Sequence, residues 1–142
     1  IGEQTVDSVD VSQMNSEAAH GLKGAATTIE GEFESLPSRQ AATGGWFSYD
    51  LLADPDVPLT LMCTYRGSGG LLRSFNILID GEHVATETLE YHPSEFLDRA
   101  YSLPLSVTQG KTKITVRFEA REEAIAGSLF DLRLVRGLQN AQ

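Results

Sequence analysis

The chain has 142 residues, and its 11 basic and 20 acidic side chains give a formal net charge of −9 at pH 7. This excess of negative charge repels nucleic acid phosphates and anionic lipid headgroups, so we expect no nucleic acid partner and no membrane partner. The 41% of apolar residues suffices for one domain over residues 1–142, and no apolar run approaches the length of about 20 residues that crosses a bilayer.

Residues 1–45 are polar, acidic and punctuated by glycine, without a long helical period. We therefore expect a loop-rich segment made of extended pieces and loops. Within it, residues 16–20 are predicted to form one helical turn capped by Ser16, and residues 30–43 an exposed, mobile loop. The first residue is Ile1 rather than methionine, so we expect a processed or excised piece of a longer protein.

From residue 44 onward, apolar residues recur at every second position, as in half-buried strands. Such runs span 47–51, 59–65, 75–79, 83–89, 114–118 and 128–135, with an extended stretch at 103–105. Asp80-Gly81 separates two runs and is a strong hairpin signal. The core-facing side chains are predicted to include Phe75, Ile77 and Ile79 in one run and Phe130, Leu132 and Leu134 in another. About seven or eight strands without βαβ spacing predict an all-β fold, an antiparallel β-sandwich.

The residue patterns match no catalytic or metal centre. The three histidines are widely spaced, no G-x-S-x-G elbow occurs, and the acidic clusters are typical of solvated loops rather than of a glycosidase pair. Cys63 alternates with apolar neighbours and is expected to be a buried structural thiol. Asp54 and Asp56 could contribute to a structural calcium site, although turn chemistry also explains them. We expect a chain that is not itself an enzyme and that requires no cofactor.

Four aromatic and arginine side chains are the candidates for ligand binding: Trp46, Arg66, Arg73 and Tyr91. Trp46 lies opposite the core-facing residues of its strand, the arginines flank a glycine-rich loop, and Tyr91 falls in another loop. Sugar recognition uses aromatic faces against C–H surfaces and charged side chains against hydroxyls. Two alternatives remain open. Trp46 packs under the N-terminal segment while the arginines pair with acidic residues, or the same residues dock a neighbouring domain.

The order of several segments resembles one bacterial family. The segments are 11–24, 44–51, 75–81, 84–89, 110–118 and 126–133. Together they resemble the accessory β-sandwich found C-terminal to the catalytic region in bacterial proteins similar to glycoside hydrolase family 127, the β-L-arabinofuranosidases. The resemblance implies a jelly-roll, galactose-binding-like architecture and a non-catalytic role.

That role would be to support the catalytic domain of the parent protein or to contact glycan, so the implied partners are that domain and a glycan. The resemblance also implies a periplasmic or extracellular location. The alternative is an independent carbohydrate-binding module. No segment resembles the catalytic centre of those enzymes, and the catalytic cysteine is not carried over to Cys63.

Overall fold

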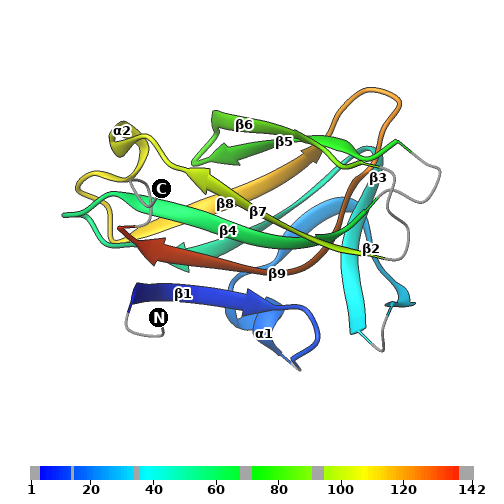
Figure 1. Ribbon diagram of the computed structural model, residues 1–142, viewed down its shortest axis with the longest axis horizontal. Helices are drawn as coiled ribbons and strands as arrows, with labels where there is room; N and C mark the ends of the chain where they lie inside the picture. The colour runs from blue at the N-terminus through cyan, green and yellow to red at the C-terminus, as the bar shows by residue number, and fades with distance from the viewer. Residues whose placement is uncertain (1–3, 14, 34–35, 68–71, 91–94, 138–142) are drawn as a thin grey trace.

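The computed structural model describes residues 4–13, 15–33, 36–67, 72–90 and 95–137 (Figure 1). The elements run in the order β1 (Thr5–Asp10), α1 (Ser16–Ala19), β2 (Lys23–Phe33), β3 (Leu36–Leu52), β4 (Leu59–Arg66), β5 (Ser74–Ile79), β6 (Glu82–Thr88), β7 (Phe96–Ser102), α2 (Leu105–Thr108), β8 (Lys113–Ala120) and β9 (Ala126–Arg136). Neither helix in these ranges has the length and apolar character needed to cross a membrane.

The strands form one antiparallel sheet that folds over into two layers. The strand order is β6-β5-β8-β3-β9-β4-β7, with β1 paired to β9 and β2 paired to β3. The sheet folds at β3, because residues 46–52 of β3 pair with β8 whereas Arg39 and Ala41 pair with β9. The first layer therefore holds β6, β5, β8 and the later half of β3. The second holds the earlier half of β3 with β9, β4, β7 and β1, and the predicted β-sandwich is confirmed.

Glycines allow β2 and β3 to bend together from one layer to the other. Gly44 has a φ of +83°, which a residue with a side chain rarely adopts. A Cβ on Gly45 would lie 2.4 Å from the carbonyl oxygen of Ala25, and one on Gly24 would lie 2.6 Å from that of Trp46. These two strands can therefore approach each other and turn only because glycine occupies these positions.

The expectation of a loop-rich segment over residues 1–45 is wrong. Strand β1, helix α1, strand β2 and the first part of β3 occupy it, and Gly24 and Gly45 serve close packing of β2 against β3 rather than loops. The predicted exposed loop over 30–43 is the end of β2 and the start of β3, and Ser38, Arg39 and Ala41 in it are buried. The helical turn exists as α1, but the residue at its N-cap is Asn15, and the Ser16 hydroxyl instead accepts a hydrogen bond from the Asp10 amide.

The core lies between the two layers and contains the predicted inward-facing residues of β3, β4 and β5. These are Phe47, Tyr49, Leu51, Leu61, Cys63, Tyr65, Phe75, Ile77 and Ile79. The expectation of a buried Cys63 is confirmed, and burial raises the pKa of its thiol. The hairpin is also confirmed, since Asp80 and Gly81 have φ values of 51° and 85°, the sign pattern of a type I′ turn.

Strand β9 departs from simple alternation. The register with β4 shifts so that Tyr65 lies opposite Leu129, and Leu129 enters the core with Leu132 and Leu134. Phe130, which was predicted to share their face, instead packs edge-on against Phe96 with ring centroids 4.9 Å apart. A bulge adds one residue to a strand, so the side chains before the bulge point to the opposite face from the one that simple alternation predicts.

The remaining difference concerns β7, which the sequence pattern does not predict. Its side chains alternate between exposed and half-buried, as expected at the edge of a sheet. Strands β6 and β7 are the two ends of the strand order and are not paired with each other. Between them, Glu87 on β6 accepts hydrogen bonds from Tyr101 Oη at 2.7 Å and from Arg99 Nε at 3.4 Å. Polar contacts therefore link these two strands. The expected extended stretch at 103–105 leads into α2.

We predict that Ile77→Ala lowers the free energy of unfolding by about 2–5 kcal/mol, because the side chain is fully buried and its removal leaves a cavity. Ile29→Ala is the matched control, since Ile29 is 47% exposed and the same truncation should cost less than about 1 kcal/mol there. Urea denaturation of both variants measures the difference. Equal losses in the two would contradict the assignment of β5 to the core.

Candidate functional site

One end of the sandwich, which we call the loop end, is built from the connections that carry the predicted binding residues. The Leu89 amide donates to the Arg73 carbonyl at 2.9 Å, and the Gly67 amide donates to the Glu95 carbonyl at 3.1 Å. The segments that follow β4 and β6 are thereby tied together. In Figure 1 this end lies at the right, where the loop after β8 is drawn in orange, and α2 lies at the opposite end.

The two predicted arginines differ in their surroundings. Arg66 is half-buried at the end of β4, where it pairs in register with Phe96. Arg73 is buried, and its Nη1 donates to Ser128 Oγ at 3.1 Å and lies 3.5 Å from Gln40 Oε1. Arg66 therefore offers a guanidinium nearer the surface, whereas Arg73 holds polar side chains of β3 and β9 in place. Tyr91, the fourth predicted residue, lies outside the described residues.

Trp46 lies on the outer face of β3 and is half-buried. The guanidinium carbon of Arg117 lies 4.0 Å from the centroid of its ring, and Arg117 Nη2 donates to Glu119 Oε2 at 2.6 Å. A cation over an aromatic face is attracted to its π electrons. One face of the indole is therefore occupied by Arg117, so a ligand would meet the other face or the ring edge. Trp46 and Arg73 thus face different surroundings, the outer sheet face and the interior.

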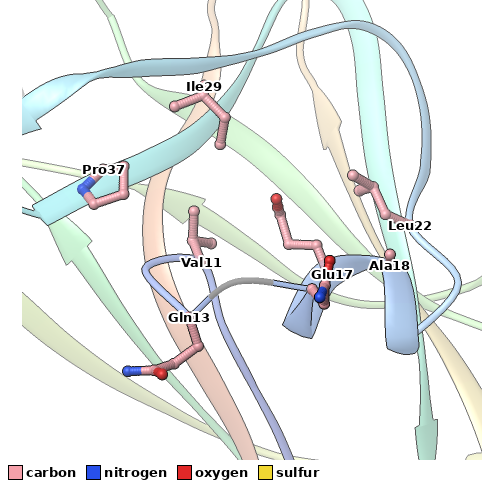
Figure 2. A pocket seen from close by; sticks show the side chains of 8 residues that line it. Val11, Gln13, Glu17, Ala18, Leu22, Ile29 and Pro37 are labelled. Atoms are coloured by element: carbon pink, nitrogen blue, oxygen red, sulfur yellow. The ribbon is translucent and has the colours of Figure 1, made fainter.

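A second feature is an apolar hollow beside α1, with a volume of about 460 Å³. It is lined by Val11, Gln13, Asn15, Glu17, Ala18, Leu22, Ile29 and Pro37. Figure 2 shows the Glu17 side chain reaching from α1 into the space between Val11, Leu22 and Ile29. The walls are mainly apolar, so the hollow suits an apolar side chain better than a sugar hydroxyl.

The Glu17 carboxylate at this hollow is fully engaged by the protein. Arg39 binds it through both nitrogens of its fork, with Nε 2.9 Å from Oε2 and Nη2 2.8 Å from Oε1. Tyr49 Oη donates to Oε2 at 2.6 Å. The Glu17 carboxylate raises the pKa of Arg39 against the effect of burial, and burial together with Glu17 raises the pKa of Tyr49. The network links α1 to both halves of β3.

The sequence did not reveal this network. Its one signal is that Arg39 and Lys23 are the only basic residues among the first 60, so an acidic partner for Arg39 could have been foreseen. Which of ten acids it meets depends on where α1 packs, and no local pattern determines that.

We predict that Glu17→Gln lowers the free energy of unfolding by about 3–5 kcal/mol, because it leaves the Arg39 guanidinium buried without its counter-charge. The side chains of Arg39 and Glu17 are only 11% and 14% exposed. Tyr49→Phe, which removes one hydrogen bond and keeps the ring, should cost about 1–2 kcal/mol. Chemical denaturation of both variants tests the order. A Glu17→Gln loss no larger than that of Tyr49→Phe would show that the ion pair is not the main contact.

His20 attaches the other side of α1 to the sheet. Its Nδ1 lies 2.8 Å from the Ser16 carbonyl oxygen, and its Nε2 lies 2.9 Å from Asp7 Oδ1. Both partners are acceptors, so the protonated ring, with two N–H donors, satisfies both contacts. Burial disfavours this charge, but the two hydrogen bonds and the Asp7 carboxylate outweigh it and raise the pKa of His20 above its ordinary value of 6.5. For Asp7, burial opposes the effects of Leu52, His20 and Ser8, which lower its pKa below 3.8.

This pair predicts a window of stability in pH. Its contribution is complete between about pH 4 and 6.5, is lost as pH rises through the raised pKa of His20, and is lost as pH falls through the lowered pKa of Asp7. The amplitude should be about 0.5–1 kcal/mol, as for a partly exposed pair. His20→Gln should abolish the loss on the alkaline side, and His83→Gln, in an exposed position, should not. Denaturation midpoints measured between pH 4 and 9 give this pH dependence. If His20→Gln loses as much stability above pH 6.5 as the wild-type chain does, the assignment to His20 is wrong.

The possible calcium ligands Asp54 and Asp56 lie in a turn. Asp54 Oδ1 accepts a hydrogen bond from the Asp56 amide at 3.0 Å, and Oδ2 accepts one from Arg136 Nε at 2.7 Å. Turn formation and the Arg136 contact therefore account for Asp54. No group of three or more His, Cys, Asp or Glu side chains suited to a metal ion occurs within the described ranges. The expectation of calcium gains no support at this position.

The fold is similar to that of solved family 35 carbohydrate-binding modules. The chain is similar to a module from Clostridium thermocellum, with a TM-score of 0.68 and 10% identity over 82% of this chain and 92% of that one. A family 35 module in complex with a disaccharide containing glucuronic acid gives a TM-score of 0.66 and 17% identity over 92% and 93%. A Phanerochaete chrysosporium exo-β-1,3-galactanase gives 0.65 and 9% over 89% of this chain but only 28% of the galactanase.

The chain belongs to a family of unknown function, DUF6805, whose model matches residues 1–135. No curated protein matches it. At these identities the solved structures establish the fold alone.

Proposed function

We propose that this chain is a non-catalytic carbohydrate-binding domain that acts beside the catalytic domain of a glycoside hydrolase. The observation that carries the proposal is the similarity to family 35 carbohydrate-binding modules, which extends over most of both chains. In the galactanase, the matching part is less than a third of the chain, which is the arrangement expected for an accessory domain. The resemblance to β-L-arabinofuranosidase-like proteins suggests the class of the parent enzyme.

We place the glycan site at the loop end, with Trp46, Arg66, Arg73 and Tyr91 as its candidate residues. Loops at one end of a rigid sandwich are a common location for binding residues. Thr5 pairs with Val135, so the start of β1 and the end of β9 lie side by side, and β9 begins at the loop end. The described chain therefore enters and leaves at the end opposite to the loops, and a neighbouring domain attached there would leave them accessible.

The residues have distinct roles in this proposal. Arg66, on the outer face of the second layer, donates hydrogen bonds to sugar hydroxyl or carboxylate groups. Trp46, on the outer face of the first layer, contacts a different part of the glycan with the part of the indole that Arg117 leaves open. Arg73 is a positioning residue, since its guanidinium holds Gln40 and Ser128. The arginines favour an acidic or a neutral saccharide over a basic one.

We predict weak glycan binding, with a Kd of about 0.1–1 mM, that Arg66→Ala reduces by about tenfold. Arg136→Ala is the matched control, because Arg136 ends a strand at the opposite end of the sandwich and should leave the affinity unchanged. Trp46→Ala should reduce binding and also lower the free energy of unfolding by about 1–3 kcal/mol, since the ring is half-buried and stacked on Arg117.

A glycan array with the wild-type chain, followed by calorimetry on the variants, makes the measurement. The array should include plant arabinans, xylans and galactans and glucuronic acid derivatives. If the folded wild-type chain binds none of them at millimolar concentration, the carbohydrate-binding proposal fails.

A second function is favoured by the apolar hollow. Ile29 is 47% exposed and Leu36 is 37% exposed beside it, and exposed apolar residues at a hollow are typical of protein contacts. In this alternative the domain supports the catalytic domain through α1, β2 and the start of β3, and it contacts no sugar. The two functions differ on the glycan array, where a purely supporting domain binds nothing.

A further inference from the structure

The outer face of the second layer carries a polar groove that begins next to the loop end, since Arg66 follows Thr64 of the groove by two residues on the same face of β4. It crosses β7, β4 and β9, has a volume of about 310 Å³, and borders a further hollow of about 200 Å³ over β1 and β9. The side chains that we assign to this polar groove are Met62, Thr64, Asp98, Asp131, Arg133 and Asp10. Strand pairing, rather than loop structure, therefore fixes its shape.

The register of the strands sets the spacing of these groups. Thr64 lies opposite Asp98 on one side and Asp131 on the other, and Met62 lies opposite Arg133. Residues two apart on one strand face the same side and are about 7 Å apart. Arg133 and Asp131 thus present a hydrogen-bond donor and an acceptor at a separation that spans a sugar ring, with the Met62 thioether between the strands as an apolar surface.

The donor and the acceptor retain capacity for a ligand. Within the described residues, the hydrogen bond found for the Arg133 guanidinium is to the Met62 sulfur at 3.8 Å, a weak acceptor, and no carboxylate forms an ion pair with it. Asp131 is half-buried and also forms no ion pair in this part of the chain. Burial raises the pKa of Asp131 against a hydrogen bond from Thr64, which lowers it, and the nearby Asp10 and Asp98 carboxylates raise it against the charge of Arg133. Both groups would gain from hydroxyl partners.

The charge of the polar groove selects among sugars. It contains three carboxylates and one available guanidinium, because Arg99 at its margin is bound to Glu87 and Glu90. A uronic acid would meet net repulsion here, whereas a neutral sugar can donate hydroxyl protons to Asp98 and Asp131 and accept from Arg133.

We propose that this polar groove is a second carbohydrate site, which binds a neutral saccharide through Arg133, Asp131 and the surface of Met62. The inference rests on the proposed function for the class of ligand but concerns a different surface. The loop end and the polar groove would then contact separate parts of one glycan or two chains of a polysaccharide, and the combined affinity would exceed that of either site.

The test is a two-dimensional ¹H–¹⁵N NMR titration of the whole chain with neutral arabino-, xylo- and galacto-oligosaccharides and, separately, with glucuronic acid. We expect a neutral oligosaccharide to shift the amides of residues 62–64, 98 and 131–133, and glucuronic acid to leave them unchanged. Arg133→Gln should weaken binding in the groove by about tenfold, and Arg136→Gln on the same strand should not. Asp131→Asn keeps the shape of the side chain and should also weaken binding in the groove. This second variant keeps the proposal testable if Arg133→Gln does not fold.

The outcomes separate this inference from the proposed function. Shifts confined to the loop end would overturn the second site and leave the proposed function standing. Shifts in the groove that persist in Arg66→Ala and vanish in Arg133→Gln would support it. Groove shifts of equal size with glucuronic acid would contradict the charge argument, and the absence of shifts anywhere would overturn both proposals.

Discussion

The bend of β3 is the constraint on which the rest of the structure depends. One strand belongs to both layers, and its two halves pair with different neighbours, β9 before the bend and β8 after it. Glu17 fastens this bend, because its carboxylate binds Arg39 in the first half and Tyr49 in the second. The glycines allow the turn and the buried ion pair stabilises it. Loss of either would destabilise the bend on the side where α1 packs.

This arrangement leaves the surfaces free for different tasks. The core residues of β3, β4, β5, β8 and β9 hold the two layers together, so most outward-facing side chains of the sheet are not needed for that packing. The loop end and the carboxylate-rich groove on the second layer present different sets of side chains to a ligand. A polysaccharide that contacts both surfaces at once fits the accessory role that we propose.

Much of the fold could be predicted from the sequence where side chains alternate without interruption. The alternation of Phe75, Ile77 and Ile79 and the Asp80-Gly81 turn determine both the strand and its hairpin, because burial and turn geometry are local properties. The N-terminal 45 residues could not be read in this way. Their glycines serve contacts between β2 and β3, and their strand pairing depends on partners far away in the sequence.

The candidate site shows the same division. The residue types of Trp46, Arg66 and Arg73 could be selected from the sequence, but their surroundings could not. The stacking of Arg117 on Trp46 follows from the register of β3 and β8, and the burial of Arg73 follows from Ser128 on β9. The polar groove could not be predicted from the sequence, because Asp131, Arg133 and Met62 come from two strands far apart in the chain and each has the pattern of an ordinary outward-facing residue.

Hydrogen exchange of the whole chain, with and without a saturating oligosaccharide selected by the array, tests the central claim most directly. The account predicts slower exchange of backbone amides in the peptides that cover residues 40–46 and 64–74, while α1 and the beginning of β2 are unaffected. Exchange that is unchanged throughout, or slowed only around the apolar hollow, would contradict a carbohydrate site at the loop end.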